Sequence, residues 1–523
     1  MGKYLNPGNL TFAEIREDNY VDKTGLIDVI NHSINKNSRL SCVSRPRRFG
    51  KSFAAAMLCA YYDRSCDSHE IFGGLEISKT ADYEKHLNQY NVICLDISDI
   101  IGTLKDSTIV EFIQDNVKRE LMDEIPGLKM EEGFSDTLLN AVELTGSKFV
   151  MVIDEWDIPI REMRDQVDEY LRLLRALFKS SITTNRIFAA VYMTGILPIK
   201  KNTTGSALSN FEEYTILDTR KFMKYTGFLE DEVKKLCEEK NVDFNQMKEW
   251  YDGYALDVDT SVYNPYSVMK ALEDKSFKSY WKKTSAVEEL LTYIDMNMNG
   301  LQEDIVKLMG GEKISVNVSN FANDTHSLYD KNDVLTLLIH LGYLTYEAVQ
   351  EDYGLVSIPN KEIQSEFDHI LKRGRHDKLI KLVQESDKLL NDTLQGNGDA
   401  VAAVVDKVRS TNYAPTYYND EQALRSVIRM AYITCVDQYI KIEELPSGHG
   451  IADVVYLPVS TLNLPALIIE IKWNRTSEGA IAQIKNNNYP AVIKEYFGEI
   501  VLVGIDYDEK NKKHTCTIEK FIK

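Results

Sequence analysis

One short segment of the sequence, residues 45–53, combines side chains that could hold phosphate groups. A glycine followed by a lysine and a hydroxyl residue at the start of a helix is typical of a phosphate-binding loop, because the loop's backbone N–H groups and the helix N-terminus attract anions. In such a loop Lys51 would reach the β- and γ-phosphates of a nucleotide, and the hydroxyl of Ser52 would bind Mg²⁺. The predicted nucleotide-binding residues of the segment are Arg45, Pro46, Arg47, Arg48, Phe49, Gly50, Lys51, Ser52 and Phe53.

The segment departs from the strict pattern, since Arg45 stands where the first glycine is expected. A Gly-Lys-Ser that begins a helix by chance is therefore an alternative. A second group of residues favours the phosphate-binding interpretation: the hydrophobic run 149–153 predicts a buried strand, and Asp154 and Glu155 follow it directly. Carboxylates at the end of a buried strand are unfavourable without a cation nearby. They match a Walker B ending, in which Asp154 holds Mg²⁺ and Glu155, together with Lys51, is catalytic.

The elements that carry these residues alternate between strands and helices. Thr194 ends a predicted strand which, in additional-strand P-loop ATPases, lies between the two Walker strands, so Thr194 is a candidate sensor of the γ-phosphate. Capping of the following turn is the alternative role for Thr194. Strands separated by helices indicate a parallel sheet that is covered on both faces. The sequence predicts strands at 40–44, 91–95, 149–153 and 186–194, and helices at 51–62, 107–125 and 162–180.

Near the end of the sequence, two carboxylates and a lysine form another pattern with chemical potential. Glu470 and Lys472 are alternate residues of one predicted strand and therefore share a face, while Asp453 lies in the strand before it. If the two strands form a hairpin, both carboxylates could bind a divalent ion, and Lys472 could position or activate water at a scissile phosphate. A solvated Glu–Lys pair on an edge hairpin is the alternative.

The elements around this pattern follow the order α-β-β-β-α-β. Together with the Asp…Glu-x-Lys pattern, this order resembles the PD-(D/E)XK nuclease superfamily, although Ala452 replaces the usual proline before Asp453. The resemblance implies that Asp453 and Glu470 hold Mg²⁺, or Mn²⁺ in its place, that Lys472 lies beside the attacked phosphate, and that Gln483 and Glu421 are further polar candidates. The predicted elements are helices at 420–436 and 478–488 and strands at 438–445, 451–457, 466–472 and 499–505.

Composition indicates a folded protein of several domains. The chain has 523 residues, of which 44% are hydrophobic and 27% charged, and its formal net charge is −19. This charge argues against a protein that binds nucleic acid over its whole surface. Residues 401–523 are nearly neutral, however, and permit contact with nucleic acid there. Seven scattered cysteines without a Cys-x-x-Cys pair predict neither a disulfide framework nor a zinc site. No signal peptide or membrane-spanning run is recognisable, so we expect a cytoplasmic protein without a membrane partner.

Several segments together resemble a bacterial family usually called AAA-ATPase-like, whose members commonly carry a C-terminal nuclease-superfamily domain. The resemblance rests on SRPRRFGKS, VIDEWDIPI, TFAEIREDNYVDKT, WYDGY and YNPYS, and it extends over nearly the whole chain. Arg45 in place of the first glycine is usual in this family. The resemblance implies binding of ATP with Mg²⁺ and hydrolysis of ATP. The aromatic residues of WYDGY and YNPYS could stack on bases, but we expect them to form the core of a helical lid.

We therefore expect an α/β protein in three parts. Residues 1–218 form an additional-strand P-loop ATPase domain, residues 219–408 a helical lid with a winged-helix-like module, and residues 409–523 a PD-(D/E)XK nuclease-like α/β domain. The predicted function is ATP hydrolysis coupled to metal-dependent cleavage of nucleic acid, with DNA favoured as the partner of the last domain. A homo-oligomer is compatible with this prediction. Two alternatives stay open: a regulatory NTPase switch whose inactive nuclease-like domain only binds DNA or a protein, and a scaffold that binds nucleotide without hydrolysing it.

Overall fold

The computed structural model divides into two compact units. The first comprises Met1–Lys282 and Ser315–Ile363, and the second comprises Lys283–Ile314 and Gln364–Lys523. The predicted middle region, 219–408, is divided between these units. The structure describes residues 2–18, 20–199, 208–257, 260–281, 301–319, 321–322, 328–373, 377–412, 418, 420–433, 435, 439–447, 450–458, 464–487 and 498–522.

A five-stranded parallel sheet forms the centre of the first unit, and its strands lie in the order β2-β3-β4-β1-β5. The predicted parallel sheet is confirmed, and β4 lies between the strand that precedes Lys51 and the strand that ends at Asp154. The first strand residue of β4 is Phe188 rather than the predicted Arg186, because Arg186 belongs to a helix. The strands are β1 (Leu40–Ser44), β2 (Asn91–Asp96), β3 (Phe149–Asp154), β4 (Phe188–Gly195) and β5 (Glu212–Tyr214).

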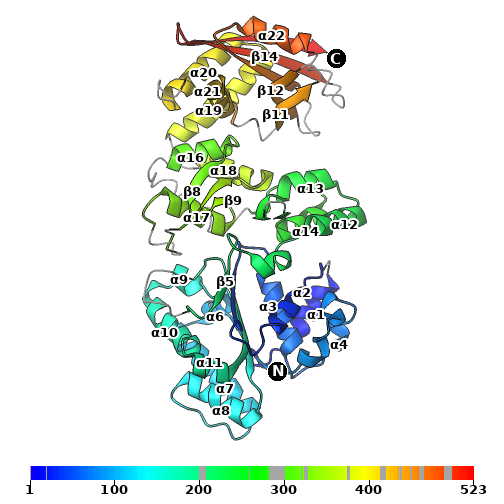
Figure 1. Cartoon of the computed structure of the whole chain (residues 1–523), viewed down its shortest axis with the longest axis vertical. Helices are drawn as coiled ribbons and strands as arrows, with labels where there is room; N and C mark the ends of the chain where they lie inside the picture. Colours follow the sequence, from blue (N-terminus) through cyan, green and yellow to red (C-terminus); the bar gives the residue numbers. More distant parts are fainter. Residues whose placement is uncertain are drawn as a thin grey trace. The chain divides into compact units, whose positions relative to one another are not determined.

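Helices cover both faces of this sheet, as expected for parallel strands, and β1, β3 and β4 are buried along their whole length (Figure 1). One hydrophobic core lies between the sheet and α1, α2 and α3. The other lies between the sheet and α6, α7, α8 and α10. The helices of this part are α1 (Leu10–Glu17), α2 (Gly25–Asn31), α3 (Lys51–Tyr62), α4 (His69–Phe72), α5 (Tyr83–His86), α6 (Ile97–Thr103), α7 (Ile109–Glu124), α8 (Phe134–Thr145), α9 (Ile158–Glu162), α10 (Val167–Phe178) and α11 (Ser181–Ile187).

The rest of the first unit is a helical region followed by a small sheet. In the region where we expect a winged-helix-like module, a helix, α17, is followed by a hairpin of β9 and β10. An additional strand, β8, pairs with β10. We did not predict β8, which is four residues long and only half-buried. The elements are α12 (Glu230–Lys240), α13 (Phe244–Tyr251), β6 (Tyr254–Asp257), β7 (Thr260–Val262), α14 (Pro265–Asp274), β8 (Ile314–Asn317), α17 (Lys331–Leu341), β9 (Thr345–Gln350) and β10 (Tyr353–Ser357).

The second unit consists of helices followed by a five-stranded sheet in the order β11-β12-β13-β14-β15. The predicted helix and strand order is present, and β15 adds an antiparallel strand at one edge that we did not predict. Only β13 and β14 run parallel. The elements are α16 (Leu301–Met309), α18 (Lys361–Arg373, which begins in the first unit), α19 (Asp377–Gln395), α20 (Gly398–Asn412), α21 (Glu421–Ala431), β11 (Tyr439–Ser447), β12 (Gly450–Pro458), β13 (Ala466–Trp473), α22 (Ser477–Asn486), β14 (Glu499–Asp508) and β15 (Lys513–Ile522).

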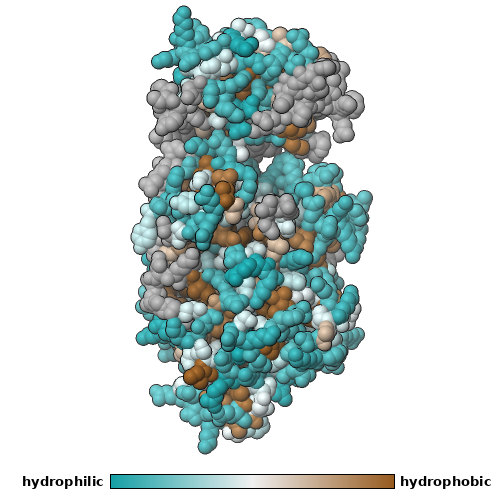
Figure 2. All heavy atoms as spheres, in the orientation of Figure 1, coloured by the Kyte–Doolittle hydropathy of each residue, from teal (hydrophilic) through white to brown (hydrophobic). Residues whose placement is uncertain are grey.

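The surface agrees with the acidic, polar composition. Figure 2 shows hydrophilic residues over most of the visible face, with hydrophobic residues in scattered patches. Among the helices that the structure describes, none is long and apolar enough to cross a membrane.

Candidate functional site

The segment from β1 to α3 forms a tight turn that brings its backbone around an open space. Two residues of the turn, Arg48 and Gly50, have positive φ angles of 70° and 83°. Apart from Gly50 and its chain neighbours, no atom of the described residues lies within 4 Å of the position that a Cβ on Gly50 would occupy. Lys51 and Ser52 then begin α3, so unpaired N–H groups of the first helical turn face the same space. This local geometry fits a cradle for phosphate groups.

The ammonium group of Lys51 lies inside this turn. Its Nζ donates hydrogen bonds of 3.1 Å to the carbonyl oxygen of Arg45 and 2.9 Å to that of Pro46. The side chain is buried, and burial lowers the pKa of Lys51 while the nearby carboxylates of Asp154 and Glu155 act in the opposite direction. A buried cation held by two neutral carbonyls is poised to accept an anionic partner.

Arg45, which replaces the first glycine of the loop, has a buried side chain that points into the protein. Its Nε donates to Oγ1 of Thr226 at 2.9 Å, and its Nη1 donates to the carbonyl oxygens of Ser44 and Tyr214. Burial lowers the pKa of Arg45 to about 10. The guanidinium thus links the ends of β1 and β5, so only the backbone of Arg45 is left to contribute to the predicted nucleotide contacts.

The outer residues of the loop contact the helical region of the same unit. Arg48 donates a 2.6 Å hydrogen bond to the carbonyl oxygen of Tyr280, and its guanidinium lies 4.5 Å from the ring centre of Tyr266. Phe49 is buried and packs edge-to-face on Tyr254. Tyr251, Tyr254 and Tyr263 are fully buried, as expected for a packing cluster rather than a base-stacking surface, whereas Tyr266 is exposed.

The remaining residues of the segment differ in exposure. Pro46 is buried, and a Cβ on Gly342 would approach its ring to 2.8 Å. Ser52 is exposed at the mouth of the loop, where its hydroxyl can reach a ligand. Phe53 is 57% exposed on α3, and the contacts among described residues assign it no role in the site.

Asp154 and Glu155 stand at the carboxyl end of β3. Oδ1 of Asp154 accepts hydrogen bonds from Thr194 Oγ1 at 2.8 Å and from the backbone N–H of Glu155 at 3.1 Å. Glu155 has a φ of 53°, an uncommon backbone conformation for a residue with a side chain. Burial raises the pKa of Glu155, as expected for a carboxylate prepared to take up a proton.

Thr194 lies between the two Walker strands, as predicted, and its hydroxyl is bonded to Asp154. Thr194 therefore orients a carboxylate, a role that neither of the two sequence interpretations included.

Two acidic residues near this edge, Asp96 and Asp157, were not identified from the sequence. Asp96 ends β2 and lies opposite Asp154 in the strand register, and burial raises its pKa. Asp157 is fully buried and accepts hydrogen bonds from the backbone N–H groups of Ile196 and Leu197 and from Nε of Arg161. Asp157 does stand in the VIDEWDIPI stretch, but only the fold shows that it holds the segment after β4.

A pocket of about 260 Å³ opens beside Glu155. Arg47 from the loop and Arg161 from α9 both line it, so two basic side chains share this pocket with the candidate catalytic carboxylate. Within the described part of the chain, the side chain of Arg47 makes no hydrogen bond or ion pair, whereas that of Arg161 is bound to Asp157 and Glu162. The lining residues are Arg47, Ser98, Ile101, Glu155, Ile158, Arg161 and Glu162.

In the second unit, the strand register brings the two predicted carboxylates together. Val454 pairs with Ile469, so Asp453 and Glu470 follow on facing strands, and Oδ2 of Asp453 accepts a 2.8 Å hydrogen bond from the N–H of Ile471. Oε1 of Glu470 accepts from Nζ of Lys472 at 2.7 Å. The side-chain amide of Gln483 on α22 also donates to this oxygen. Thus two polar side chains, Lys472 and Gln483, and the carboxylate of Asp453 surround Glu470.

The site contains one cation that we did not predict. Nη2 of Arg425 on α21 lies 2.5 Å from Oδ1 of Asp453, while Glu421 on the same helix is exposed. Oε2 of Glu470 is buried and has no hydrogen-bond partner among the described residues. Burial, reinforced by Asp453, raises the pKa of Glu470 to about 7. An orphaned carboxylate oxygen fits a divalent cation, whereas Asp453 would have to exchange Arg425 for it.

Neither site offers a complete metal cage. In the ranges that the structure describes, no cluster of three or more histidine, cysteine, aspartate or glutamate side chains could hold a metal ion. Mg²⁺ commonly binds through one or two carboxylates and takes its other ligands from water and substrate phosphates. Both candidate sites fit this mode of binding.

Comparisons with known proteins identify the first part of the chain. Residues 8–204 match a family model described as "Predicted AAA-ATPase". The N-terminal region of this protein is AAA-ATPase-like. An uncharacterized protein in the vnfD 5′ region of Azotobacter chroococcum mcd 1 is 22% identical over 542 residues, which cover 98% of this chain and 97% of the relative.

Two solved structures also align with the chain. The Aeropyrum pernix ORC2 protein in ADPNP–ADP complexes is 12% identical, with a TM-score of 0.29 and coverage of 68% of this chain and 96% of that one. A DNA replication initiation factor is 11% identical, with a TM-score of 0.25 and coverage of 71% and 90%. At these TM-scores neither alignment adds to the argument, which rests on the residues of the site and on the family match.

Proposed function

We propose that the first unit binds ATP with Mg²⁺ and hydrolyses it. The observation that carries the proposal is the position of four residues at the carboxyl edge of the sheet. Asp154 ends β3 and Glu155 follows it directly, Thr194 stands next to the end of β4, and Lys51 begins α3 after the loop that follows β1. Ligands of open α/β sheets bind at this edge. The AAA-ATPase-like match over residues 8–204 includes all four residues.

Each residue of this edge has a defined task in the proposed reaction. Lys51 exchanges its two backbone carbonyl partners for phosphate oxygens, and Ser52 and Asp154 hold Mg²⁺, which supplies charge neutralisation on the phosphates. Glu155 orients the attacking water and accepts its proton, a step favoured by the raised pKa of this carboxyl. Thr194 fixes Asp154 through its hydrogen bond.

Arg47 supplies the positive charge that phosphoryl transfer needs near the γ-phosphate. It lines the pocket beside Glu155, and no hydrogen bond or ion pair within the described residues engages its guanidinium. Arg161 lines the same pocket but is held by Asp157 and Glu162. We therefore assign the role of an arginine finger in cis to Arg47.

ATP turnover by the full-length chain tests this proposal. Phosphate release is measured for the wild type, Lys51→Ala, Glu155→Gln and the surface control Lys129→Ala, and nucleotide affinity is measured in parallel. We expect Lys51→Ala to abolish turnover and weaken binding, Glu155→Gln to abolish turnover while binding persists, and Lys129→Ala to behave like the wild type. Wild-type turnover in Lys51→Ala would refute the assignment. Binding without turnover in the wild type would favour the scaffold alternative.

We further propose that the second unit is a PD-(D/E)XK nuclease-like domain that acts on nucleic acid, with DNA favoured. Support comes from the convergence of Asp453, Glu470, Lys472 and Gln483 on one end of the β12–β13 pair. Asp453 and Glu470 would hold Mg²⁺ or Mn²⁺, which supplies charge at the scissile phosphate. Lys472, now bound to Glu470, would position the attacking water.

Cleavage assays separate this function from its alternative. Linear DNA, circular DNA and RNA are each incubated with Mg²⁺ or Mn²⁺, with and without ATP, and the wild type is compared with Lys472→Ala and the surface control Lys510→Ala. We expect the wild type and Lys510→Ala to cleave a substrate that Lys472→Ala does not cleave. If ATP turnover is intact and no substrate is cut, the protein is a regulatory NTPase whose second unit binds DNA or a protein partner.

A further inference from the structure

A second cavity, of about 590 Å³, lies in the first unit at the amino ends of β2 and β3. Because the strands of this sheet are parallel, the cavity and the phosphate-binding loop lie at opposite edges of it. Three segments form the cavity: the loop before β1, the end of α3 with the loop before β2, and the turn before β3. The lining residues are Asn35, Arg64, Asn88, Gln89, Tyr90, Gly146, Ser147 and Lys148.

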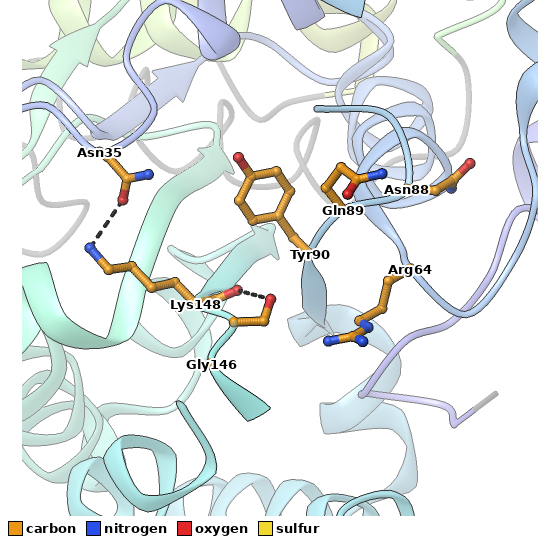
Figure 3. Close-up of a pocket in the computed structure, with 8 residues that line it drawn as sticks. Asn35, Arg64, Asn88, Gln89, Tyr90, Gly146 and Lys148 are labelled. Carbon is orange, nitrogen blue, oxygen red and sulfur yellow. Dashed lines mark hydrogen bonds between the residues drawn. The ribbon is translucent and has the colours of Figure 1, made fainter. Parts of the chain in front are cut away.

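The lining is basic and polar, and none of its described residues is acidic. Figure 3 shows Lys148 reaching toward Asn35 on one side of the Tyr90 ring and Arg64 on the other side. Nζ of Lys148 donates a 3.1 Å hydrogen bond to Oδ1 of Asn35. The side chain of Arg64 makes no hydrogen bond or ion pair within the described part of the chain. Two cations thus face a cavity without a carboxylate, in a protein whose net charge is −19.

The cations could instead serve the ends of helices, since Arg64 follows α3 and Lys148 follows α8. The carbonyl groups at the end of α3 are already bonded, however. The N–H of Asn88 donates to the carbonyl oxygen of Tyr61 at 2.7 Å, and that of Tyr90 donates to Tyr62 at 2.9 Å. Arg64 is therefore not needed to satisfy this helix end. Burial and the nearby Arg39 lower the pKa of Lys148.

We propose that this cavity binds a small phosphorylated ligand, with phosphate groups at Arg64 and Lys148 and a polar remainder against the amide side chains. Its volume lies within the range of small-molecule sites, about 300–1,000 Å³. Arginine and lysine are the residues that bind phosphate most effectively. Since α3 runs from Lys51 to Tyr62, about 18 Å of helix separates the cavity from the phosphate-binding loop. The ligand is therefore a separate molecule from the ATP of the proposed function.

Binding of two probes to the full-length protein tests the proposal independently of ATP hydrolysis. All proteins carry Lys51→Ala, which removes the lysine of the phosphate-binding loop. Inorganic pyrophosphate and ADP are titrated calorimetrically into this parent, into Arg64→Gln/Lys148→Gln and into the control Arg186→Gln. Arg186 is a surface arginine on α11, paired with Glu143, and it precedes β4 at the same edge of the sheet. A short duplex DNA serves as competitor.

We expect the double variant to bind at least one probe about tenfold more weakly than the parent, the control to match the parent, and the melting temperatures to agree. Binding of pyrophosphate alone identifies an oligophosphate ligand, whereas tighter binding of ADP identifies a nucleotide; both support the site. Three results would overturn the proposal. These are equal affinities in parent and double variant, no binding of either probe, and displacement of both probes by DNA, which would make the cations part of a nucleic-acid surface.

Discussion

The hydroxyl of Thr194 donates a 2.8 Å hydrogen bond to Oδ1 of Asp154, from one parallel strand to its neighbour. Both side chains are almost fully buried, so this bond fixes the direction of a carboxylate whose other oxygen can bind Mg²⁺. The bond makes Thr194 a positioning residue, because its effect on the reaction passes through Asp154.

Removal of this hydroxyl is expected to reduce ATP turnover. Thr194→Val keeps the shape of the side chain but deletes a hydrogen bond to a charged group, a change of about 1.5–3 kcal/mol or roughly ten- to hundredfold in rate. Nucleotide affinity without Mg²⁺ should not change, while the Mg²⁺ concentration for half-maximal turnover should rise. Thr194→Ser, which retains the hydroxyl, should restore the wild-type value. A Thr194→Val protein with normal Mg²⁺ dependence would contradict the positioning role.

Restoring the missing glycine of the loop is expected to damage the protein. Arg45→Gly deletes a buried guanidinium that bonds to Thr226, Ser44 and Tyr214, and we expect the free energy of unfolding to fall by roughly 3 kcal/mol. Urea titration measures the loss. Arg45→Lys keeps the positive charge but loses the planar guanidinium group with its several N–H donors, so its stability should lie between those of the wild type and Arg45→Gly. The prediction fails if Arg45→Gly is as stable as the wild type.

The second unit should bind Mn²⁺ more tightly when Arg425 is replaced. The guanidinium of Arg425 lies against Asp453, so Arg425→Gln frees one carboxylate oxygen and removes a competing positive charge. We expect calorimetric Mn²⁺ affinity to increase about tenfold, which corresponds to about 1.4 kcal/mol of binding free energy. The surface variant Lys510→Gln is the control. Weaker Mn²⁺ binding by Arg425→Gln would show that the arginine orients Asp453 for the metal instead of competing with it.

The stability of the metal-free protein should fall between about pH 4.5 and 7 because of Glu470. Its pKa is about 7 in the folded protein and 4.5 in the reference state, so the folded state binds the additional proton over this range. The protonated Glu470 therefore contributes its full share of the free energy of unfolding below pH 4.5, and this contribution is lost as the pH rises through 7. At about 1.4 kcal/mol per pKa unit, the loss is on the order of 3 kcal/mol. Denaturation at several pH values measures it. In Glu470→Gln this part of the pH dependence should be absent, and an unchanged profile would contradict the prediction.

Much of the fold could be predicted because its signals are local. The strands β2 and β3 contain continuous hydrophobic runs, and α3 begins and ends where the sequence indicates. The strand β15 was missed because residues 513–522 alternate polar and apolar side chains at a sheet edge, with no continuous hydrophobic run. An edge strand of this kind obtains its stability from the neighbouring strand rather than from its own composition.

Residues with long-range partners could not be predicted. The role of Asp157 depends on the end of β4 lying beside the segment after β3, and that of Arg425 depends on α21 lying against β12. Likewise, the side chain of Arg45 contacts residues about 170–180 positions further along the chain. Residue type and spacing were enough to predict the phosphate-binding loop, the carboxylates Asp154 and Glu155 with Thr194, and the pattern of Asp453, Glu470 and Lys472.

Arg48 contacts Tyr280, and Phe49 contacts Tyr254. These two contacts limit how short a fragment of the chain can be while its nucleotide site stays intact. A fragment that stopped at residue 218 would keep the sheet and every residue proposed for catalysis, yet it would leave the buried ring of Phe49 in water and Arg48 in its left-handed conformation without support. Such a fragment should aggregate or bind nucleotide poorly. We therefore expect any fragment that keeps the nucleotide site intact to extend at least through Tyr280.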